Sequence, residues 1–476
     1  YLLKGGKVAT FVHGEDAPRV YEADVLVEGN TITRIDKNIQ REKGVEIIDC
    51  TNKWITPGFV DTHRHVFQTV MRASHGKYVV KPSLISSLRI RSVQGSLTPE
   101  EVGIGALAGY LDALHNGVTT VLDHFHAAHT PAHAEAALRA AVESGARAIW
   151  APARQSAPTQ LLPSMEFAQE AETEKWQREQ FREWGENDGN LRPDGRVKLG
   201  LSYDISWQGA ISGHKEWIDY ARANNAHIIT AHAGRGPLIL SWRDGGLLGP
   251  DVLFSHCNGL ADQREPDAES WKALKESGAA IGATPVGEVG MSYGNTVAID
   301  ASKRGVKAGL GADTTSVNGG DLFTPMRVAL QWTRGREHQH AHQNGIKPPL
   351  HLPYGPADVF RLATLGGAEA LNLAHLIGTV EVGKRADLLV FDADSVNLGG
   401  ADDPISGVVF HASSEDIEIV FVDGEIVKKE KKLVRDWKPI VRELKERAKA
   451  IRARWPEEKQ EEVWKAWYEA NGPPVF

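Results

Sequence analysis

Residues 57–65 read Pro57-Gly58-Phe59-Val60-Asp61-Thr62-His63-Arg64-His65. This apolar run ends in two histidines that are one residue apart, and residues i and i+2 of an extended chain share a face. His63 and His65 can therefore point in one direction while Arg64 points elsewhere. Because imidazole is the usual protein ligand for divalent transition metals, the pair predicts part of a metal site at the end of a strand.

The middle of the chain alternates between short β-branched runs and longer amphipathic stretches, which predicts an α/β fold of the (β/α)8 TIM-barrel type. An open doubly wound sheet explains the same alternation, but no glycine fingerprint supports a dinucleotide site. The expected strands are Trp54–Val60, Val118–Asp123, Arg147–Ala151, Val197–Ser202, His227–His232, Val252–His256, Ala279–Ala283 and Val306–Gly311. The helical patterns between them include Pro131–Ser144, His214–Asn224, Glu269–Ser277 and Phe323–Arg336.

Both ends of the chain are rich in short strands, which indicates one small β-sandwich domain assembled from the two ends. Two unrelated β pieces are less favoured, because each alone is small for a stable core. We therefore expect four parts: residues 1–56 and 376–430 form the sandwich, 57–375 the metal-dependent barrel, and 431–476 a helical extension. A helix packed on the barrel exterior is favoured for this extension over an oligomer contact.

The composition excludes several classes of protein. The 476 residues hold 54 Lys and Arg against 62 Asp and Glu, and 41 % are hydrophobic, so disordered, collagen-like and coiled-coil chains are excluded. The acidic excess argues against nucleic acid as a partner, and no apolar run approaches the roughly 20 residues that span a bilayer. Two cysteines fit a reducing compartment. We expect a cytoplasmic homo-oligomer with a small-molecule substrate and no membrane partner.

Three further expected strands end in side chains that can bind a metal. His232 and His256 each close a strand, and Asp313 follows Val306–Gly311. Singly, each is more often a capping or hydrogen-bonded core residue. Together with the first histidine pair, however, they occupy four strand ends of one barrel, where barrel enzymes place their active sites. Three nitrogen ligands and one carboxylate suit Zn²⁺ or Fe²⁺ with an open position for water.

With these motifs in place, the sequence resembles the amidohydrolase superfamily, in its cytosine-deaminase-like and S-adenosylhomocysteine/methylthioadenosine-deaminase-like branch. The resemblance covers nearly the whole chain and implies a metal-bearing (β/α)8 barrel with a β-sandwich built from both termini. Its motifs are residues 57–65, Asn116-Gly117-Val118-Thr119-Thr120-Val121-Leu122-Asp123, Ser255-His256-Cys257, Gly309-Leu310-Gly311-Ala312-Asp313, Gly366-Gly367-Ala368-Glu369-Ala370-Leu371 and the stretch 377–388.

The resemblance also implies the roles of individual residues. One divalent metal ion, Zn²⁺ with Fe²⁺ or Mn²⁺ as alternatives, would be held by His63, His65, His232 and Asp313. His256 would stand beside the bound water or the substrate. Lys198 lies near the start of the fourth strand, so no lysine is placed to bridge a second metal, and a mononuclear site is favoured.

This set of residues fits hydrolysis of a C–N bond. The metal would lower the pKa of its water toward roughly 7. Asp313 can take the proton of that water and pass it to a leaving group, as a general base and then a general acid. His256 can stabilise the charge that develops on the group under attack. We predict a hydrolase acting on a small cyclic or heteroaromatic nitrogen compound.

One departure from the branch affects this prediction. Its deaminases carry a glutamate two residues after the fifth-strand histidine, where it shuttles protons to the ring nitrogen, whereas this chain has Gly234 there. Glu288 is a candidate replacement carboxylate in the catalytic machinery, and a solvated loop glutamate is the alternative. The same metal barrel could instead catalyse a non-hydrolytic reaction, such as lyase, decarboxylase, ring-opening or dehydration chemistry. A non-catalytic small-molecule binder is the least favoured reading.

Four residues are candidate substrate contacts. His124 and His126 form a second pair of histidines one residue apart, and Gln68 and Arg72 follow the first pair closely. For Arg72 a structural salt bridge is the alternative. The long segment Phe67–Leu97 is expected to be a lid over the site. The polar tract Glu337–His342 is expected to be a surface loop.

Overall fold

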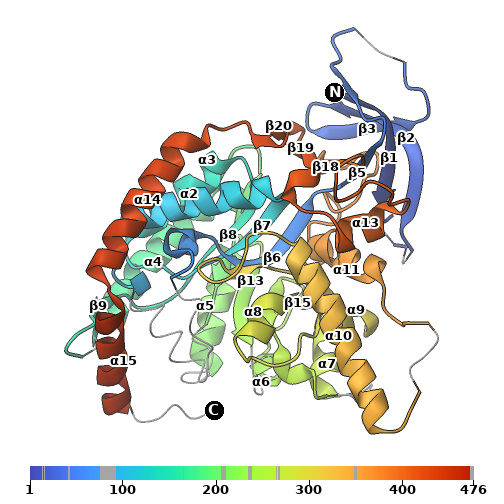
Figure 1. The fold of residues 1–476 in the computed structure, drawn as a ribbon. Helices are drawn as coiled ribbons and strands as arrows, with labels where there is room; N and C mark the ends of the chain where they lie inside the picture. Colours follow the sequence, from blue (N-terminus) through green and yellow to red (C-terminus); the bar gives the residue numbers. More distant parts are fainter. Residues whose placement is uncertain are drawn as a thin grey trace.

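The structure is a computed structural model that describes residues 1–12, 14–15, 17–40, 43–74, 93–164, 166–204, 211–233, 238–263, 265, 268–347 and 351–471. It consists of a barrel of parallel strands surrounded by helices, with a second sheet packed beside it (Figure 1). The second sheet contains strands from both ends of the chain. The predicted fold class is therefore confirmed.

The barrel strands pair in parallel around a closed ring, and the expected fourth strand is divided into two pieces at Gly200. The first piece pairs with the strand before it and the second with the strand after it, so the ring closes through this segment. The strands are β6 (Phe59–His65), β7 (Val118–Phe125), β8 (Arg147–Pro152), β11 (Val197–Leu199), β12 (Leu201–Ser202), β13 (Ile229–Ala233), β14 (Val252–His256), β15 (Ala280–Ala283), β16 (Lys307–Leu310) and β17 (Asp313–Thr314).

The first expected strand, Trp54–Val60, is wrong as a single strand. The chain divides at Gly58 into β5 (Lys53–Pro57), which belongs to the second sheet, and β6, which belongs to the barrel. A Cβ on Gly58 would lie 2.2 Å from Oγ1 of Thr119, so only glycine lets the chain pass this close to β7 while it changes sheets. The apolar run hides this change because both strands are buried.

Helices cover the outside of the barrel, and two of them, α3 and α7, have the predicted bounds. The tract Glu337–His342 is not a surface loop, as expected, but the last part of α10. Arg336 anchors this part of the helix by hydrogen bonds of 2.8 and 3.0 Å to Asp300. The helices of this layer are α2 (Pro99–His115), α3 (Pro131–Ser144), α4 (Glu170–Trp184), α5 (Ile211–Ala223), α6 (Leu238–Asp244), α7 (Glu269–Ser277), α8 (Pro285–Gly290), α9 (Ala298–Lys303), α10 (Phe323–Gln343), α11 (Pro356–Ala363) and α12 (Leu365–Ala370).

The second sheet brings the two ends of the chain together. Arg147 at the start of β8 ties it to the barrel, because its guanidinium donates to both Asp387 and Asp423 in a buried network. The strands are β1 (Leu2–Thr10), β2 (Arg19–Glu28), β3 (Thr31–Asp36), β4 (Ile47–Asp49), β5, β18 (Leu388–Asp392), β19 (Ile417–Val422), β20 (Glu425–Lys429) and β21 (Lys432–Leu433). The division of the chain at residues 56, 375 and 430 stays a prediction.

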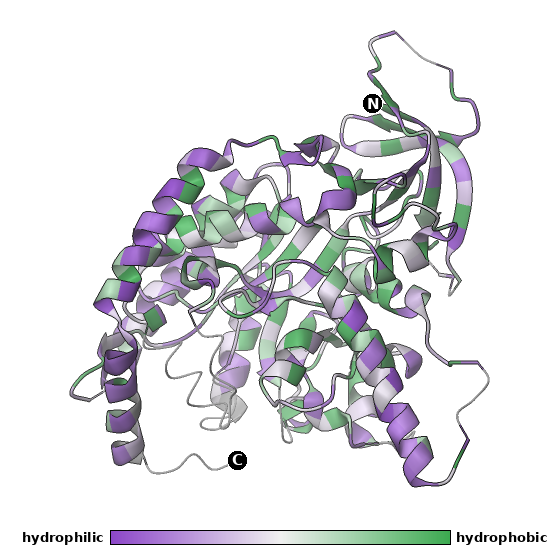
Figure 2. Cartoon of the chain, in the orientation of Figure 1, coloured by the Kyte–Doolittle hydropathy of each residue, from purple (hydrophilic) through white to green (hydrophobic). Residues whose placement is uncertain are grey.

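Apolar residues gather in the barrel strands and on the inner faces of the helices, while the outer helices are rich in polar residues (Figure 2). Among the latter, α14 (Trp437–Arg454) packs along α2 and continues as α15 (Glu457–Asn471). Its last residue, Arg454, donates to the buried carboxylate of Glu101 at 2.6 Å. Smaller elements are β9 (Pro158–Gln160), β10 (Glu166–Phe167), α13 (Pro404–Phe410) and the 3-10 turns η2 (Asn187–Gly189), η3 (Asn258–Leu260) and η4 (Ser414–Asp416).

The segment expected to be a lid, Phe67–Leu97, begins as the 3-10 helix η1 (Val66–Met71), which packs against α2. Residues 75–92 lie outside the described part of the chain, so the role expected for this segment stays a prediction. Among the helices that the structure describes, none is long and apolar enough to cross a membrane.

Candidate metal centre

The carboxyl ends of the barrel strands bring the four predicted metal ligands together. The rings of His63 and His65, at the end of β6, have centroids 4.8 Å apart. The ring of His232 on β13 lies 4.9 Å from that of His63 and 5.3 Å from that of His65. Asp313 begins β17, which pairs with the end of β6. The spacing argument for the two histidines and the strand-end argument for the other two residues thus lead to one location.

Each histidine of β6 is held by Nδ1 and directs Nε2 toward Asp313. Nδ1 of His63 hydrogen-bonds Ser255 Oγ at 2.8 Å, and Nδ1 of His65 donates to a backbone carbonyl at 2.8 Å. The two Nε2 atoms lie 3.6 and 3.4 Å from Oδ1 of Asp313. Nε2 of His63 is buried and has no hydrogen-bond partner among the residues that the structure describes, which is costly for a polar atom unless a ligand satisfies it.

The protonation states of these groups suit a metal ligand set. Burial lowers the pKa of His63 well below its ordinary value and the pKa of His65 to about 3, so both rings are neutral at pH 7. Burial opposes the charge of Asp313, but the neighbouring histidines hold the pKa of its carboxyl well below the ordinary value. Neutral imidazoles and an ionised carboxylate are the forms that bind divalent metals, so these residues fit a Zn²⁺-type ion.

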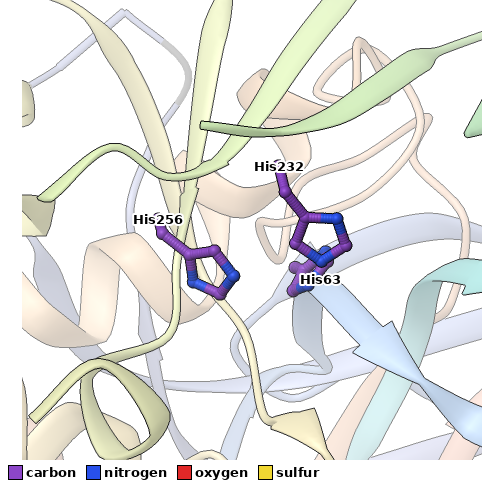
Figure 3. Close-up of side chains that lie close together, drawn as sticks. All are labelled: His63, His232 and His256. Carbon is purple, nitrogen blue, oxygen red and sulfur yellow. The ribbon is translucent and has the colours of Figure 1, made fainter. Parts of the chain in front are cut away.

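His232 and His256 complete the ring of imidazoles. Their rings stack at 5.4 Å with an interplanar angle of 25°, and His256 lies 5.2 Å from His63. Figure 3 shows the two rings projecting from neighbouring strands beside His63. One ring nitrogen from each of the three histidines lies within 4.8 Å of the others. His256 therefore borders the same space as the predicted ligands, although whether it binds the metal or the water stays a prediction.

Glu288 is not a solvated loop residue. It lies in the short helix α8 and is fully buried, with Oε1 accepting the Thr284 backbone N–H at 2.8 Å and lying 3.7 Å from Nδ1 of His256. Burial disfavours a charged imidazole, but Glu288 and Asp313 together outweigh it and raise the pKa of His256. The Glu288 carboxylate thus stands behind His256, on the Nδ1 side of its ring.

Asp204 is the site residue that the sequence reasoning missed. It follows β12, and its carboxylate accepts hydrogen bonds from Nδ1 and the backbone N–H of His232 and from Nε2 of His124. The signal was present in the sequence, because Asp204 comes two residues after the expected fourth strand. Lys198, the lysine near the start of that strand, donates to Asn190 Oδ1 at 3.0 Å.

Two site residues adopt the left-handed backbone conformation that non-glycine residues rarely use. His256 has a φ of 75° and Asp313 a φ of 62°. Such residues store strain that the surrounding fold must offset, and they cluster at functional sites. His256 ends β14, and Asp313 begins β17 just after β16, so both lie at the carboxyl end of the barrel beside the predicted metal centre.

The four predicted substrate contacts lie in different surroundings. The ring of His126 lies 4.2 Å from that of His65. Gln68 is buried on η1, and its Oε1 has no hydrogen-bond partner within the described part of the chain. His124 is buried and bonded to Asp204 at 2.9 Å. Arg72 forms an ion pair of 3.0 Å with Asp112 of α2, the alternative considered for it. Their roles toward a substrate stay predictions.

Comparison with curated proteins gives relatives along most of the chain. The methylthioadenosine/S-adenosylhomocysteine deaminase of Thermococcus kodakarensis is 27% identical over 440 residues, which cover 90% of this chain and 93% of the relative. The 5'-deoxyadenosine deaminase of Methanosarcina mazei is 26% identical over 464 residues, with 90% and 93% covered. These relatives confirm the resemblance to the deaminase-like branch.

Solved structures share the fold. The atrazine chlorohydrolase of Arthrobacter aurescens TC1 complexed with zinc superposes with a TM-score of 0.78 at 20% identity, over 94% of this chain and 99% of that chain. The adenosine deaminase of Xanthomonas campestris with bound zinc gives 0.76 at 19% identity, over 95% and 98%. The model of the Amidohydrolase family matches residues 54–427. The chain therefore belongs to the amidohydrolase family, which confirms the predicted metal-dependent hydrolase of C–N bonds.

Proposed function

We propose that this chain hydrolyses a C–N bond of a small cyclic or heteroaromatic nitrogen compound, with one divalent metal ion held by His63, His65, His232 and Asp313. Zn²⁺ is the ion that this ligand set suits best, and solved structures of the same fold were obtained with zinc. The observation that carries the proposal is the buried Nε2 of His63, which has no hydrogen-bond partner among the described residues and faces the Asp313 carboxylate.

The bound metal would supply a Lewis acid that makes water a nucleophile at neutral pH. Asp313 is placed to accept the proton of the attacking water and to return it to the departing nitrogen. His256 faces the same space, and its raised pKa favours the imidazolium that can stabilise negative charge on the group under attack. Glu288 maintains that charge from behind the ring, at 3.7 Å from Nδ1.

The substrate class is supported by the relatives named above. The curated relatives are deaminases of adenine nucleosides by name, and one structural neighbour is a triazine hydrolase. All of these names describe substrates with a nitrogen-rich aromatic ring. A nitrogen heteroaromatic with a departing group on a ring carbon is therefore the first class to test.

A non-hydrolytic reaction in the same barrel is the second candidate, and one observation favours it. The position two residues after His232 is Gly234, so the chain has no carboxylate at that point of the sequence. Glu288, the candidate replacement, lies on the Nδ1 side of His256 rather than beside His232. Its carboxylate would then act through His256 instead of carrying a proton to a substrate ring.

The test combines metal analysis with turnover. The purified chain is loaded with Zn²⁺ and assayed for ammonia release with methylthioadenosine, 5'-deoxyadenosine and a panel of aminated pyrimidines and triazines, and His63→Ala serves as the metal-site variant. We expect one metal equivalent per chain, its loss in the variant, and metal-dependent release from at least one compound. Unchanged metal content in His63→Ala would contradict the site. Turnover only of substrates without a C–N bond to break would favour the second candidate.

A further inference from the structure

We propose that Asp204 is a positioning residue for the metal centre, which fixes His232 in the Nδ1–H tautomer and thereby reserves Nε2 of that ring for the metal. The proposal rests on the metal site of the proposed function and adds a residue that no family motif of this sequence contains. It concerns the atom through which His232 binds, since either nitrogen of a neutral imidazole can act as a ligand.

The geometry at Asp204 leaves one hydrogen-bond assignment. Nδ1 of His232 lies 3.0 Å from both carboxylate oxygens, and an ionised carboxylate only accepts hydrogen bonds. The proton must therefore be on Nδ1, so the lone pair is on Nε2. The backbone N–H of His232 also donates to Oδ1 at 2.9 Å, which ties the carboxylate to the main chain of the same residue.

The ring of His232 borders the predicted metal position. The ring of His232 stands at 90° to that of His63 with a centroid distance of 4.9 Å, and it also stacks on His256 at 5.4 Å, so the three rings surround one space (Figure 3). A ring nitrogen of His232 comes within 4.8 Å of ring nitrogens of these two residues. Holding the opposite side of the ring thus determines where the ligand atom points, which is how second carboxylates orient metal-bound histidines in proteins.

His124 also holds the carboxylate of Asp204 in place by a hydrogen bond. Its Nε2 donates to Oδ2 at 2.9 Å, and the ring is fully buried. A carboxylate that accepts from three N–H groups is fixed in place, which suits a positioning residue better than a group that carries protons to a substrate.

The same three side chains, His124, Asp204 and His232, could hold a metal ion between them. That arrangement would use Nδ1 of His232 as the ligand and would remove the proton on which the present proposal depends. The two arrangements differ in metal stoichiometry and in the effect of replacing His124, so one experiment separates them.

Asp251 is a matched control for Asp204. It precedes β14 at the amino end of the barrel, opposite the metal centre, and accepts from the Arg222 guanidinium at 2.8 and 3.1 Å. The side chains of Asp204 and Asp251 are 21% and 24% exposed. Changing either aspartate to asparagine removes a charge from a bidentate hydrogen-bonded pair of similar exposure, but only one of the two pairs touches a predicted metal ligand.

The experiment measures metal affinity instead of activity alone. Wild type, Asp204→Asn, Asp204→Ala, Asp251→Asn and His124→Gln are stripped of metal, and their thermal unfolding is recorded. The stoichiometry and the Kd for Zn²⁺ are then measured by competition with a chelator. We expect Asp204→Asn to raise this Kd about 10–100-fold and Asp204→Ala at least as much, with Asp251→Asn unchanged. The visible spectrum of Co²⁺-loaded protein should change in the Asp204 variants only.

Three outcomes would contradict the proposal. A Kd within twofold of wild type in folded Asp204→Asn would exclude the positioning role. An equal loss in Asp251→Asn would show that the effect is one of general stability. A second metal equivalent in wild type that disappears in His124→Gln would assign Asp204 to a metal of its own. Wild type that binds no divalent metal contradicts the proposed function itself.

Discussion

Gly287 of α8 lies so close to Asp313 that a Cβ built on it would be 2.6 Å from Oδ2 of that carboxylate. Real Cβ atoms do not approach an oxygen this closely, so a side chain here must displace Asp313. The other oxygen of the carboxylate faces the two histidines of β6. Because Gly287 has no side chain, the carboxylate of Asp313 can occupy this space.

We predict that Gly287→Ala weakens Zn²⁺ binding about tenfold, because metal sites tolerate displacements of only about half an ångström in their ligands. The control is Gly290→Ala in the same helix, where a Cβ would meet nothing within 4 Å. Chelator competition gives the two values of Kd. Equal values in both variants would mean that Asp313 relaxes without loss and is not held by this contact.

Glu288→Gln should lower kcat about tenfold or more without changing metal content. The substitution keeps an acceptor for the Thr284 backbone N–H but removes the negative charge that lies 3.7 Å from Nδ1 of His256. A less charged His256 stabilises the developing charge less well, and positioned proton-transfer groups typically contribute about 100–10,000-fold in rate. Steady-state kinetics and elemental analysis test this together. Lost metal would place Glu288 among the groups that support the metal, and unchanged kcat would leave it a structural residue.

The predictable part of the site is the part that follows from strand periodicity. His63 and His65 share a face because they are two residues apart in a strand. His232 and His256 lie at the carboxyl ends of β13 and β14, and Asp313 follows the end of β16. Parallel barrel strands bring their carboxyl ends together whatever their order in the sequence. These residues could therefore be placed together before their distances were known.

Asp204 also follows a predicted strand end, but its role could not be predicted from that position, because its carboxylate hydrogen-bonds a metal-ligand histidine instead of matching a metal-ligand pattern of its own. The division of residues 53–65 between two sheets could not be predicted from the hydrophobic pattern either. Both β5 and β6 are buried, so the hydrophobic pattern is continuous, and the change of sheet depends on a contact between Gly58 and Thr119 that joins distant parts of the chain. The last turns of α10 were missed because their polar composition resembles a loop.

Metal removal should destabilise the folded chain by an amount that depends on His63. A ligand that binds only the folded state stabilises it by about 2.7 kcal/mol at a concentration 100 times its Kd. We expect Zn²⁺ to raise the unfolding temperature of wild type and to have no such effect on His63→Ala. The control is His227→Ala, which removes a histidine that hydrogen-bonds Leu371 O at the opposite end of the barrel. A Zn²⁺ response retained in His63→Ala would contradict the ligand assignment.

The stability of the fold should also depend on pH through Lys428. Its ammonium is fully buried on β20 and donates to the carbonyls of His115 and Ser414, both at 2.7 Å. Burial lowers the pKa of Lys428 to about 8, against about 10.4 in an unfolded chain. The cost of burying the charge is therefore present in full below pH 8 and is relieved as the pH rises to about 10.4, where the folded chain has released a proton that the unfolded chain keeps.

Comparison with Lys428→Met isolates this effect from the other groups that titrate at high pH. The free energy of unfolding of wild type, measured relative to that of the variant, should increase between pH 7 and pH 10 by up to the order of 3 kcal/mol. Lys429→Met, at the exposed neighbouring position on the same strand, controls for the loss of a lysine from β20. Denaturant unfolding at several pH values measures the difference. A difference that stays constant or falls with pH would mean that Lys428 remains fully charged in the folded chain, with the two carbonyls offsetting the cost of its burial.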